Sequence, residues 1–544
     1  MAASGAIRQT FDLVLVYWFT IRAPTAVIRD EASRSMMFNF FAKRSDHPLA
    51  DSKELKRIVA ELHVDRPAKA VDEVSGWFDS LQHAENFRVD QYFDVLRQLD
   101  EAAQRHLLAV ARDYLLSGRL TKLEEERLWT RSYRYWGQVA TLYNDCIERA
   151  QLNPKSKAGD AFNAFLPLAL VRSQAARRNQ LKWLAFRYGA GAEDLWQALG
   201  ATYLAAESAA DAQKPLQLYP ARQGQSTVAE QYLHAIVFFA SSMDSLMPVQ
   251  IELADRLIAH FLPHFVLLPD CRPDSVYWVD AVAGAPPLRL VRHPGVSRRG
   301  LRFFSPGTAL AALEELLHRV EHGERPADVN LGGDYAPRAL LPVLRHLRLY
   351  WAKHPPQRRH TRHGVKTRML VLYGFDDSYS LFSGAVPRPE NEVAMDSWVV
   401  ENVSLGGFRA QIGDSASEHI NIGALLCVQP EGGDNWMLGV ARRFTRQGPD
   451  GACLGVQVLS RQALSIELRP RRSGFSAAVA IPGIWLQDGG ETGILRIVLP
   501  LAGFNVRETL EFSHQGQQRT LIPMELEEVG SEYEIGCFRE QSAT

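Results

Sequence analysis

The sequence predicts a multidomain α+β protein with a helical N-terminal half and a strand-rich C-terminal half. At 544 residues the chain is too long for one compact domain. Apolar residues recur at three- and four-residue spacing over much of residues 50–262, which is the period of amphipathic helices. After about residue 265, short β-branched and aromatic runs bounded by Pro and Gly become common, and such runs are typical of strands.

The composition is that of a globular protein, because 46% of the residues are hydrophobic and 23% are charged. The formal net charge of −1 excludes the overall basic character of a nucleic-acid or membrane-surface protein. An anionic ligand therefore has to meet a local basic cluster. The five cysteines lie far apart and lack the spacing of a zinc site, which predicts free thiols and no bound metal.

The N-terminal region contains one hydrophobic run, FDLVLVYWFTI, which includes Asp12. This run is too short to cross a bilayer and lacks a signal-peptide cleavage pattern, so a cytoplasmic protein without a membrane span is predicted. Residues 1–45 are left as a leader without an assigned fold. The run MMFNFF reads as a natural start, and translation from Met36 or Met37 is the alternative interpretation.

Residues 46–225 are predicted to form an all-helical domain. Apolar side chains between residues 92 and 114 repeat at helical spacing and define one buried face. Thr121 and Glu124 have the spacing of a capping box, which predicts the start of the next helix. That helix carries aromatic residues that either pack against other helices or form a surface for an unidentified protein partner: Trp129, Tyr135 and Trp136.

Residues 226–353 are predicted to contain a helix and then a small α/β segment. Thr227 and Glu230 form a second capping-box pattern, and the helix they begin is expected to run to about Leu262. Short strand-like runs follow, and two further helices are predicted at about 307–322 and 337–352.

The remaining chain is predicted to be all-β, with one module at 354–470 and a further β module at 471–544. The first module opens with a basic stretch, QRRHTRHGVKTRM, that follows two prolines and contains no acidic residue. Two motifs lie in this module in a fixed order. Arg358-x-x-x-Arg362 comes first, and Asn402-x-Ser404-x-x-Gly407 follows about forty residues later.

These two motifs, at the opening of a β module, resemble those of the PilZ domain family, whose members are bacterial receptors for cyclic di-GMP. The resemblance extends over roughly residues 356–468. WMLGVARRFTRQGPDGACLGVQVL looks like the closing strand pair of such barrels. The resemblance therefore implies a six-stranded PilZ-like antiparallel β-barrel over 354–470.

The resemblance also implies a ligand site. Cyclic di-GMP carries two phosphates and two guanines, and the planar guanidinium of Arg suits both the phosphate oxygens and the guanine edge. In the family, the paired arginines lie at the flexible start of the barrel and wrap over the ligand, while the second motif forms the wall on the barrel side. Carried onto this sequence, the implied ligand-binding residues are Arg358, Arg359, Arg362, Asn402, Ser404, Gly406 and Gly407.

One position departs from the pattern of many relatives. The closing strand has Arg443-Phe444 where those relatives carry Trp. Arg443 is predicted to be either an additional ligand contact or a surface residue, and the sequence leaves both open.

The leading hypothesis is a non-catalytic cytoplasmic effector that binds cyclic di-GMP, since no GxGxxG, Walker, GxSxG or HExxH motif is present. No cofactor is expected besides this ligand. Ligand binding would change how the barrel docks against the helical interaction domain. The alternative is a constitutive protein-interaction scaffold with a structural barrel. A nucleic-acid binder that uses residues 358–368 is disfavoured, because the rest of the chain is neutral.

Overall fold

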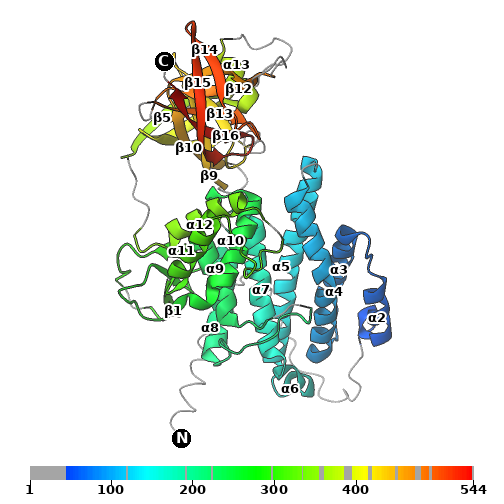
Figure 1. Cartoon of the computed structure of the whole chain (residues 1–544). Helices are drawn as coiled ribbons and strands as arrows, with labels where there is room; N and C mark the ends of the chain where they lie inside the picture. The colour runs from blue at the N-terminus through cyan, green and yellow to red at the C-terminus, as the bar shows by residue number, and fades with distance from the viewer. Residues whose placement is uncertain are drawn as a thin grey trace. The chain divides into compact units, whose positions relative to one another are not determined.

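The computed structural model divides the chain into two compact units (Figure 1). It describes residues 45–117, 120–189, 191, 193–221, 224–295, 298–333, 335–354, 360–384, 395–413, 420–446, 451–471, 479–488 and 493–541. The first unit ends at Pro355, and the second begins at Pro356 and also includes two short segments, Arg187–Ala190 and Met243–Met247.

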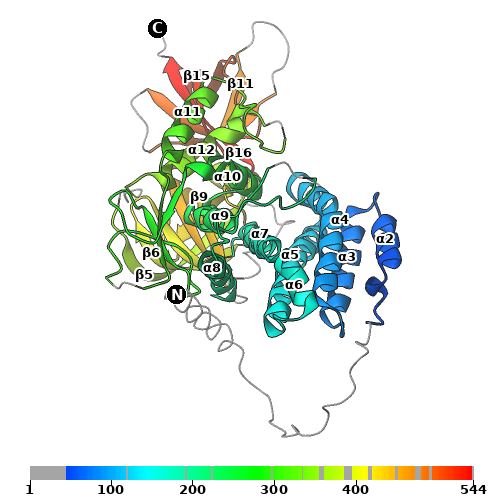
Figure 2. The same ribbon diagram turned by 90° about the horizontal axis from the view of Figure 1, so that it is seen from below.

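The first unit is mainly helical, as predicted (Figure 2). Both predicted capping boxes form, with Thr121 at the start of α5 and Thr227 at the start of α9. Up to His264, its helices are η1 (Pro48–Ala50), α2 (Ser52–Glu61), α3 (Pro67–Gln82), α4 (Val89–Leu116), α5 (Lys122–Leu152), α6 (Lys157–Asn163), α7 (Leu166–Ala185), α8 (Glu193–Ser208), α9 (Val228–Ala240), α10 (Pro248–Phe261) and η3 (Leu262–His264). The short helix η2 (Met243–Ser245) belongs to the second unit.

The core of this unit lies between α3, α4, α5 and α7. The predicted apolar face of α4 is buried along its whole length, from Tyr92 to Tyr114. Tyr135 and Trp136 are also buried, and Trp129 Nε1 donates a hydrogen bond to the carbonyl oxygen of Trp183 at 2.6 Å. Of the two roles considered for these aromatic residues, the structure therefore supports helix packing.

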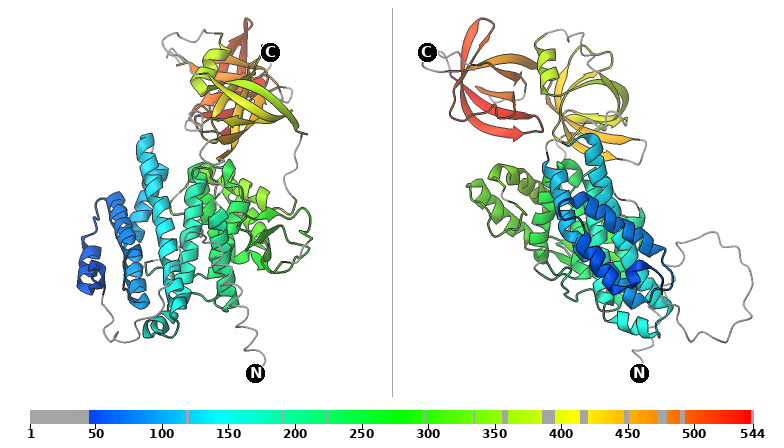
Figure 3. Two further views of the ribbon diagram at one scale, coloured as in Figure 1. Left: turned by 180° about the vertical axis from the view of Figure 1, so that it is seen from behind. Right: turned by 90° about the vertical axis from the view of Figure 1, so that its right-hand side faces the viewer.

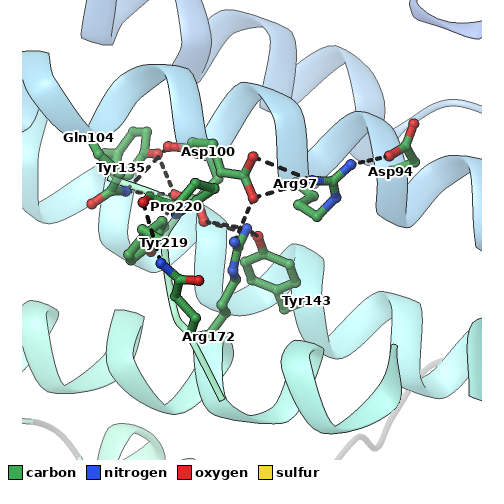
Figure 4. A network of polar contacts seen from close by, with 11 residues as sticks. Asp94, Arg97, Asp100, Gln104, Tyr135, Tyr143, Arg172, Tyr219 and Pro220 are labelled. Carbon is green, nitrogen blue, oxygen red and sulfur yellow. Dashed lines mark hydrogen bonds and ion pairs between the residues drawn. The ribbon is translucent and has the colours of Figure 1, made fainter. Parts of the chain in front are cut away.

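A buried polar network connects α4, α5 and α7 (Figure 4). The Asp100 carboxylate accepts hydrogen bonds from the hydroxyls of Tyr135 and Tyr143, both at 2.9 Å. Arg172 Nη1 lies 3.7 Å from the same carboxylate, and Arg172 Nη2 donates to Glu101 at 2.6 Å. Burial raises the pKa of Asp100, against the opposing effects of Arg172 and the tyrosine hydroxyls. These hydrogen bonds and ion pairs therefore offset the free-energy cost of burying the charges of Asp100 and Arg172.

The helix predicted to run from Thr227 to about Leu262 is interrupted, which corrects that expectation. α9 ends at Ala240, Ser242 adopts a positive φ of 58°, and α10 starts only at Pro248. Because a left-handed residue cannot continue a helix and proline favours the first helical turn, the chain turns between these points.

The small α/β segment has a four-stranded antiparallel sheet with the order β1-β4-β2-β3. Two helices follow the sheet and pack against each other. The elements are β1 (Val266–Leu268), β2 (Tyr277–Asp280), β3 (Leu288–Arg289), β4 (Leu301–Ser305), α11 (Ala309–Glu321) and α12 (Pro337–Trp351). None of the helices formed by the described residues combines the length and apolar character that a membrane crossing requires.

The second unit contains two closed barrels of antiparallel strands, both visible in Figure 3. The first has the strand order β10-β7-β6-β5-β8-β9 and confirms the predicted six-stranded barrel. Its elements are β5 (His363–Tyr373), α13 (Phe375–Phe382), β6 (Asp396–Ser404), β7 (Gly407–Ile412), β8 (Leu425–Pro430), β9 (Met437–Arg446) and β10 (Ala452–Ser460).

The further β module is a second six-stranded barrel with the order β11-β12-β13-β16-β15-β14. Its first strand lies before residue 471, so the second barrel begins earlier in the chain than the module boundary predicted from the sequence. The strands are β11 (Ala463–Pro470), β12 (Ile481–Leu486), β13 (Ile494–Pro500), β14 (Leu510–His514), β15 (Gln517–Val529) and β16 (Tyr533–Gln541).

The two barrels share one hydrophobic cluster. It joins Leu425 and Leu438 of the first barrel to Ile484, Val498 and Ile535 of the second. Because burial of apolar surface is the main source of stability, this shared cluster holds the barrels together as one body.

Candidate functional site

The second sequence motif forms the hairpin between β6 and β7. Ser404 ends β6, Leu405 and Gly406 make the turn, and Gly407 pairs with Ser404 at the start of β7. Ser404 Oγ donates a hydrogen bond to the carbonyl oxygen of Gly407 at 3.1 Å. The backbone N–H of Val458 on β10 donates to the carbonyl oxygen of Gly406 at 3.0 Å. The turn is therefore fixed from both sides.

Gly407 is required by a close backbone approach. A Cβ atom at this position would lie 2.1 Å from the carbonyl oxygen of Val456, which is far inside van der Waals contact. A Cβ at Gly406 would lie 3.2 Å from His360 Cδ2, a tight contact with a side chain. The hairpin therefore packs against β10 on one side and against His360 of the basic stretch on the other.

The first sequence motif leads into β5, which is the neighbour of β6. His363 pairs with Val403, and Gly364 pairs with Asn402. Arg362 is exposed and directly precedes this pairing. Arg358 and Arg359 lie outside the described residues. The register thus brings residues 362–364 of the basic stretch beside the Asn402–Gly407 hairpin.

A surface pocket of about 530 Å³ lies at this corner. Its walls come from both motif regions and from one residue that follows β10. The lining residues are His360, Thr361, His363, Val403, Ser404, Leu405 and Arg461. The structure therefore brings together two segments that are about forty residues apart in the sequence.

Asn402 has an unsatisfied polar atom. Its Oδ1 is buried and accepts no hydrogen bond within the described part of the chain. The carboxylate of the preceding residue, Glu401, is engaged: it lies 3.1 Å from Arg409 Nε and accepts from Gln411 Nε2 at 2.8 Å. Asn402 itself is not among the residues that line the pocket, so a contact between this oxygen and a ligand stays a prediction.

Arg443 lies on β9 and does not line the pocket. Its Nε donates a hydrogen bond to the Asp244 carboxylate at 2.5 Å, and its side chain is 56% exposed. The next residue, Phe444, is buried against Tyr188. A ligand contact by Arg443 stays a prediction.

Arg461 is the pocket residue that the sequence interpretation missed. It lies in the turn between β10 and β11, where its Nη2 donates to the carbonyl oxygen of Leu405 at 2.8 Å. Only its sequence position, as a lone cation between two strand-like runs, could have drawn attention to it.

Among the described residues, no group of three or more His, Cys, Asp or Glu side chains is arranged to hold a metal ion.

Comparison with curated proteins gave no match, and comparison with solved structures gave none either. No PilZ match was found for the barrels, so that resemblance rests on the sequence motifs. One family model does match, over residues 53–270, which is less than half of the chain and extends from α2 to β1. Its description is "Cyclic-di-GMP receptor FimW, N-terminal domain", and the helical region of this chain is therefore similar to the N-terminal domain of a cyclic di-GMP receptor.

Proposed function

We propose that this protein is a non-catalytic receptor for cyclic di-GMP and that the ligand binds at the β6–β7 corner of the first barrel. The observation that carries the proposal is the pocket in which His360–His363 and Ser404–Leu405 meet. The pairing of β5 with β6 brings Arg362, the last residue of the arginine motif, beside this hairpin.

Two separate parts of the chain support this assignment. The barrel motifs at Arg358–Arg362 and Asn402–Gly407 resemble those of cyclic di-GMP receptors, and the helical region at 53–270 matches the family of another such receptor. These two regions do not overlap, so the agreement between them is independent support.

The chemistry of the corner suits the ligand. Arg358, Arg359 and Arg362 would supply guanidinium groups for the phosphates and the guanine edges, each charge-assisted contact contributing about 1.5–3 kcal/mol. Asn402 Oδ1 supplies an acceptor that is without a hydrogen bond in the described structure. The glycines of the hairpin allow it to pack closely against His360 and β10, which fixes the shape of this corner.

We further propose that ligand binding changes how the barrels dock against the helical unit. The boundary between the two compact units falls at Pro355–Pro356, directly before the motif arginines. A ligand that binds these arginines against the barrel would shorten the chain segment that connects the two units. Distance measurements between fluorescent labels on α5 and β13 should then change on addition of cyclic di-GMP, whereas an unchanged distance would refute the docking change.

Calorimetric titration of the full chain with cyclic di-GMP tests the receptor assignment. The wild type should bind saturably, and Arg358→Ala and Arg362→Ala should each weaken binding by about tenfold or more. Arg368→Ala is the matched control, because Arg368 belongs to the same basic stretch but lies on β5 away from the pocket lining. No heat from the wild type would instead favour the scaffold function.

The same variants separate the receptor from a nucleic-acid binder. A nucleic-acid surface formed by residues 358–368 would bind oligonucleotides with a steep salt dependence, and Arg368→Ala would weaken it as much as Arg362→Ala. A receptor should prefer cyclic di-GMP to GTP and to oligonucleotides, and should be insensitive to Arg368→Ala.

A further inference from the structure

The turn that joins the two barrels contributes to the wall of the pocket. It consists of Arg461 and Gln462, between the end of β10 at Ser460 and the start of β11 at Ala463. The position of Arg461 therefore depends on how the second barrel is attached to the first.

A carboxylate of the second barrel clamps this turn. Asp488, two residues after the end of β12, accepts the backbone N–H of Arg461 at 2.9 Å and a hydrogen bond from the Ser460 hydroxyl. Burial works to raise the pKa of Asp488, but these hydrogen bonds outweigh it and lower the pKa. Asp488 is thus ionised at neutral pH and holds the turn in one conformation.

The clamped turn directs the Arg461 side chain toward the motif hairpin. Arg461 Nη2 donates to the carbonyl oxygen of Leu405, which is the first residue of the β6–β7 turn. The guanidinium of Arg461 has no ion pair within the described residues, whereas Arg409, Arg442 and Arg443 in the same barrel each pair with a carboxylate. An uncompensated cation that lines a pocket favours an anionic ligand.

We propose that Arg461 is an additional ligand-binding residue that contacts a phosphate of the nucleotide, and that the second barrel positions it through Asp488. This inference rests on the proposed function. It assigns a role to the second barrel, which carries neither of the two sequence motifs: that barrel fixes the geometry of a site formed mainly by the first.

Calorimetric titration with cyclic di-GMP of Arg461 variants in the full chain tests the ligand contact. Arg461→Ala should weaken binding by about tenfold, the loss expected for one charge-assisted contact. Arg461→Lys should bind with intermediate affinity, because Lys retains the charge but not the planar fork. Arg469→Ala is the control, since Arg469 is an exposed residue of β11 that does not line the pocket.

The positioning role of Asp488 is tested by a double-mutant cycle. Asp488→Ala should weaken binding in the wild-type background but have no further effect when Arg461 is already alanine. Asp488→Asn should restore part of the affinity, because its amide oxygen can still accept the backbone hydrogen bonds. Equal effects of Asp488→Ala in both backgrounds would overturn the positioning role, and Tm measured in parallel would show whether the variants remain folded.

The outcomes separate this inference from the proposed function. If the wild type binds and Arg362→Ala does not, but Arg461→Ala binds like the wild type, only the role of Arg461 is overturned. If the wild type fails to bind cyclic di-GMP, the receptor function and the inference are both overturned.

Discussion

Arg442 of the first barrel and Glu528 of the second form a two-pronged ion pair, with Nη1 and Nη2 of Arg442 at 2.7 and 2.5 Å from the two carboxylate oxygens. Arg442 Nε donates to Gln457 Oε1 at 2.8 Å, and the Tyr533 hydroxyl donates to Glu528 at 2.8 Å. This polar junction lies beside the shared hydrophobic cluster, to which Tyr533 also belongs. The barrels are therefore joined by directional as well as apolar contacts.

The first prediction concerns the pH dependence of this junction. Burial works to raise the pKa of Glu528, but hydrogen bonds and charge from Arg442 outweigh it, so the folded pKa lies below its ordinary value. The stabilisation is therefore complete above the unfolded pKa, about 4.3, and is lost as the pH falls through the folded value. Glu528→Gln should lower the free energy of unfolding by about 1–3 kcal/mol near neutral pH and by much less at about pH 3.

Thermal unfolding followed by tryptophan fluorescence at both pH values measures this difference. Glu511→Gln is the control, because Glu511 pairs with Arg471, whose side chain is 59% exposed. Surface pairs of this kind contribute less than about 1 kcal/mol. If the difference in the free energy of unfolding between wild type and Glu528→Gln stays constant with pH, the ion pair is not its cause.

The second prediction concerns the buried network of the helical unit. Arg172→Met leaves Asp100 buried without its cation, and removal of one member of a buried pair costs about 3–5 kcal/mol. The variant should show a markedly lower Tm in calorimetry. Arg57→Met should change Tm little, because Arg57 pairs with Glu54 and Glu61 on an exposed surface. Similar effects of the two substitutions would show that the network does not stabilise the fold.

The third prediction concerns the hairpin glycine. Gly407→Ala places a methyl group against the Val456 carbonyl oxygen, so the β7–β10 pairing must shift, at a cost of about 1–3 kcal/mol or more. Gly413→Ala, at the other end of β7, meets no atom within 4 Å and should be tolerated. Circular dichroism melts compare the two variants, and a Gly407→Ala protein as stable as Gly413→Ala would refute the close approach.

The fourth prediction separates ligand binding from folding at Asn402. Its Oδ1 accepts no hydrogen bond from the described residues, so Asn402→Ala should leave Tm nearly unchanged or slightly raised. Affinity for cyclic di-GMP should fall by about tenfold if this oxygen accepts a hydrogen bond from the ligand. Unchanged affinity would remove Asn402 from the site, and a large loss of Tm would show that the residue is structural.

Local signals in the sequence predicted much of the fold. The capping boxes at Thr121 and Thr227 and the apolar face of α4 each depend on residues within a few turns of one another, and all three were confirmed. The motif hairpin was predictable for the same reason, since Ser404 and Gly407 are adjacent partners across one turn.

The features that could not be predicted from the sequence depend on residues far apart in the chain. Asp100 and Arg172 compensate each other across two helices, and their charges alone would have suggested exposed positions. Arg461 is held at the pocket by hydrogen bonds to Asp488 and Leu405, which lie far from it in the sequence. β11 follows β10 after a turn of two residues, and no local signal in that turn shows that the strand belongs to another barrel.

Hydrogen–deuterium exchange of the full chain, with and without cyclic di-GMP, tests most directly whether the two motifs form one nucleotide site. A saturating concentration of the ligand should protect the backbone of residues 357–364 and of residues 402–408 together, because both segments would close around the same molecule. Arg362→Ala should remove the protection of both. Protection of neither segment, or of one without the other, would contradict the claim that these two motifs form one nucleotide site.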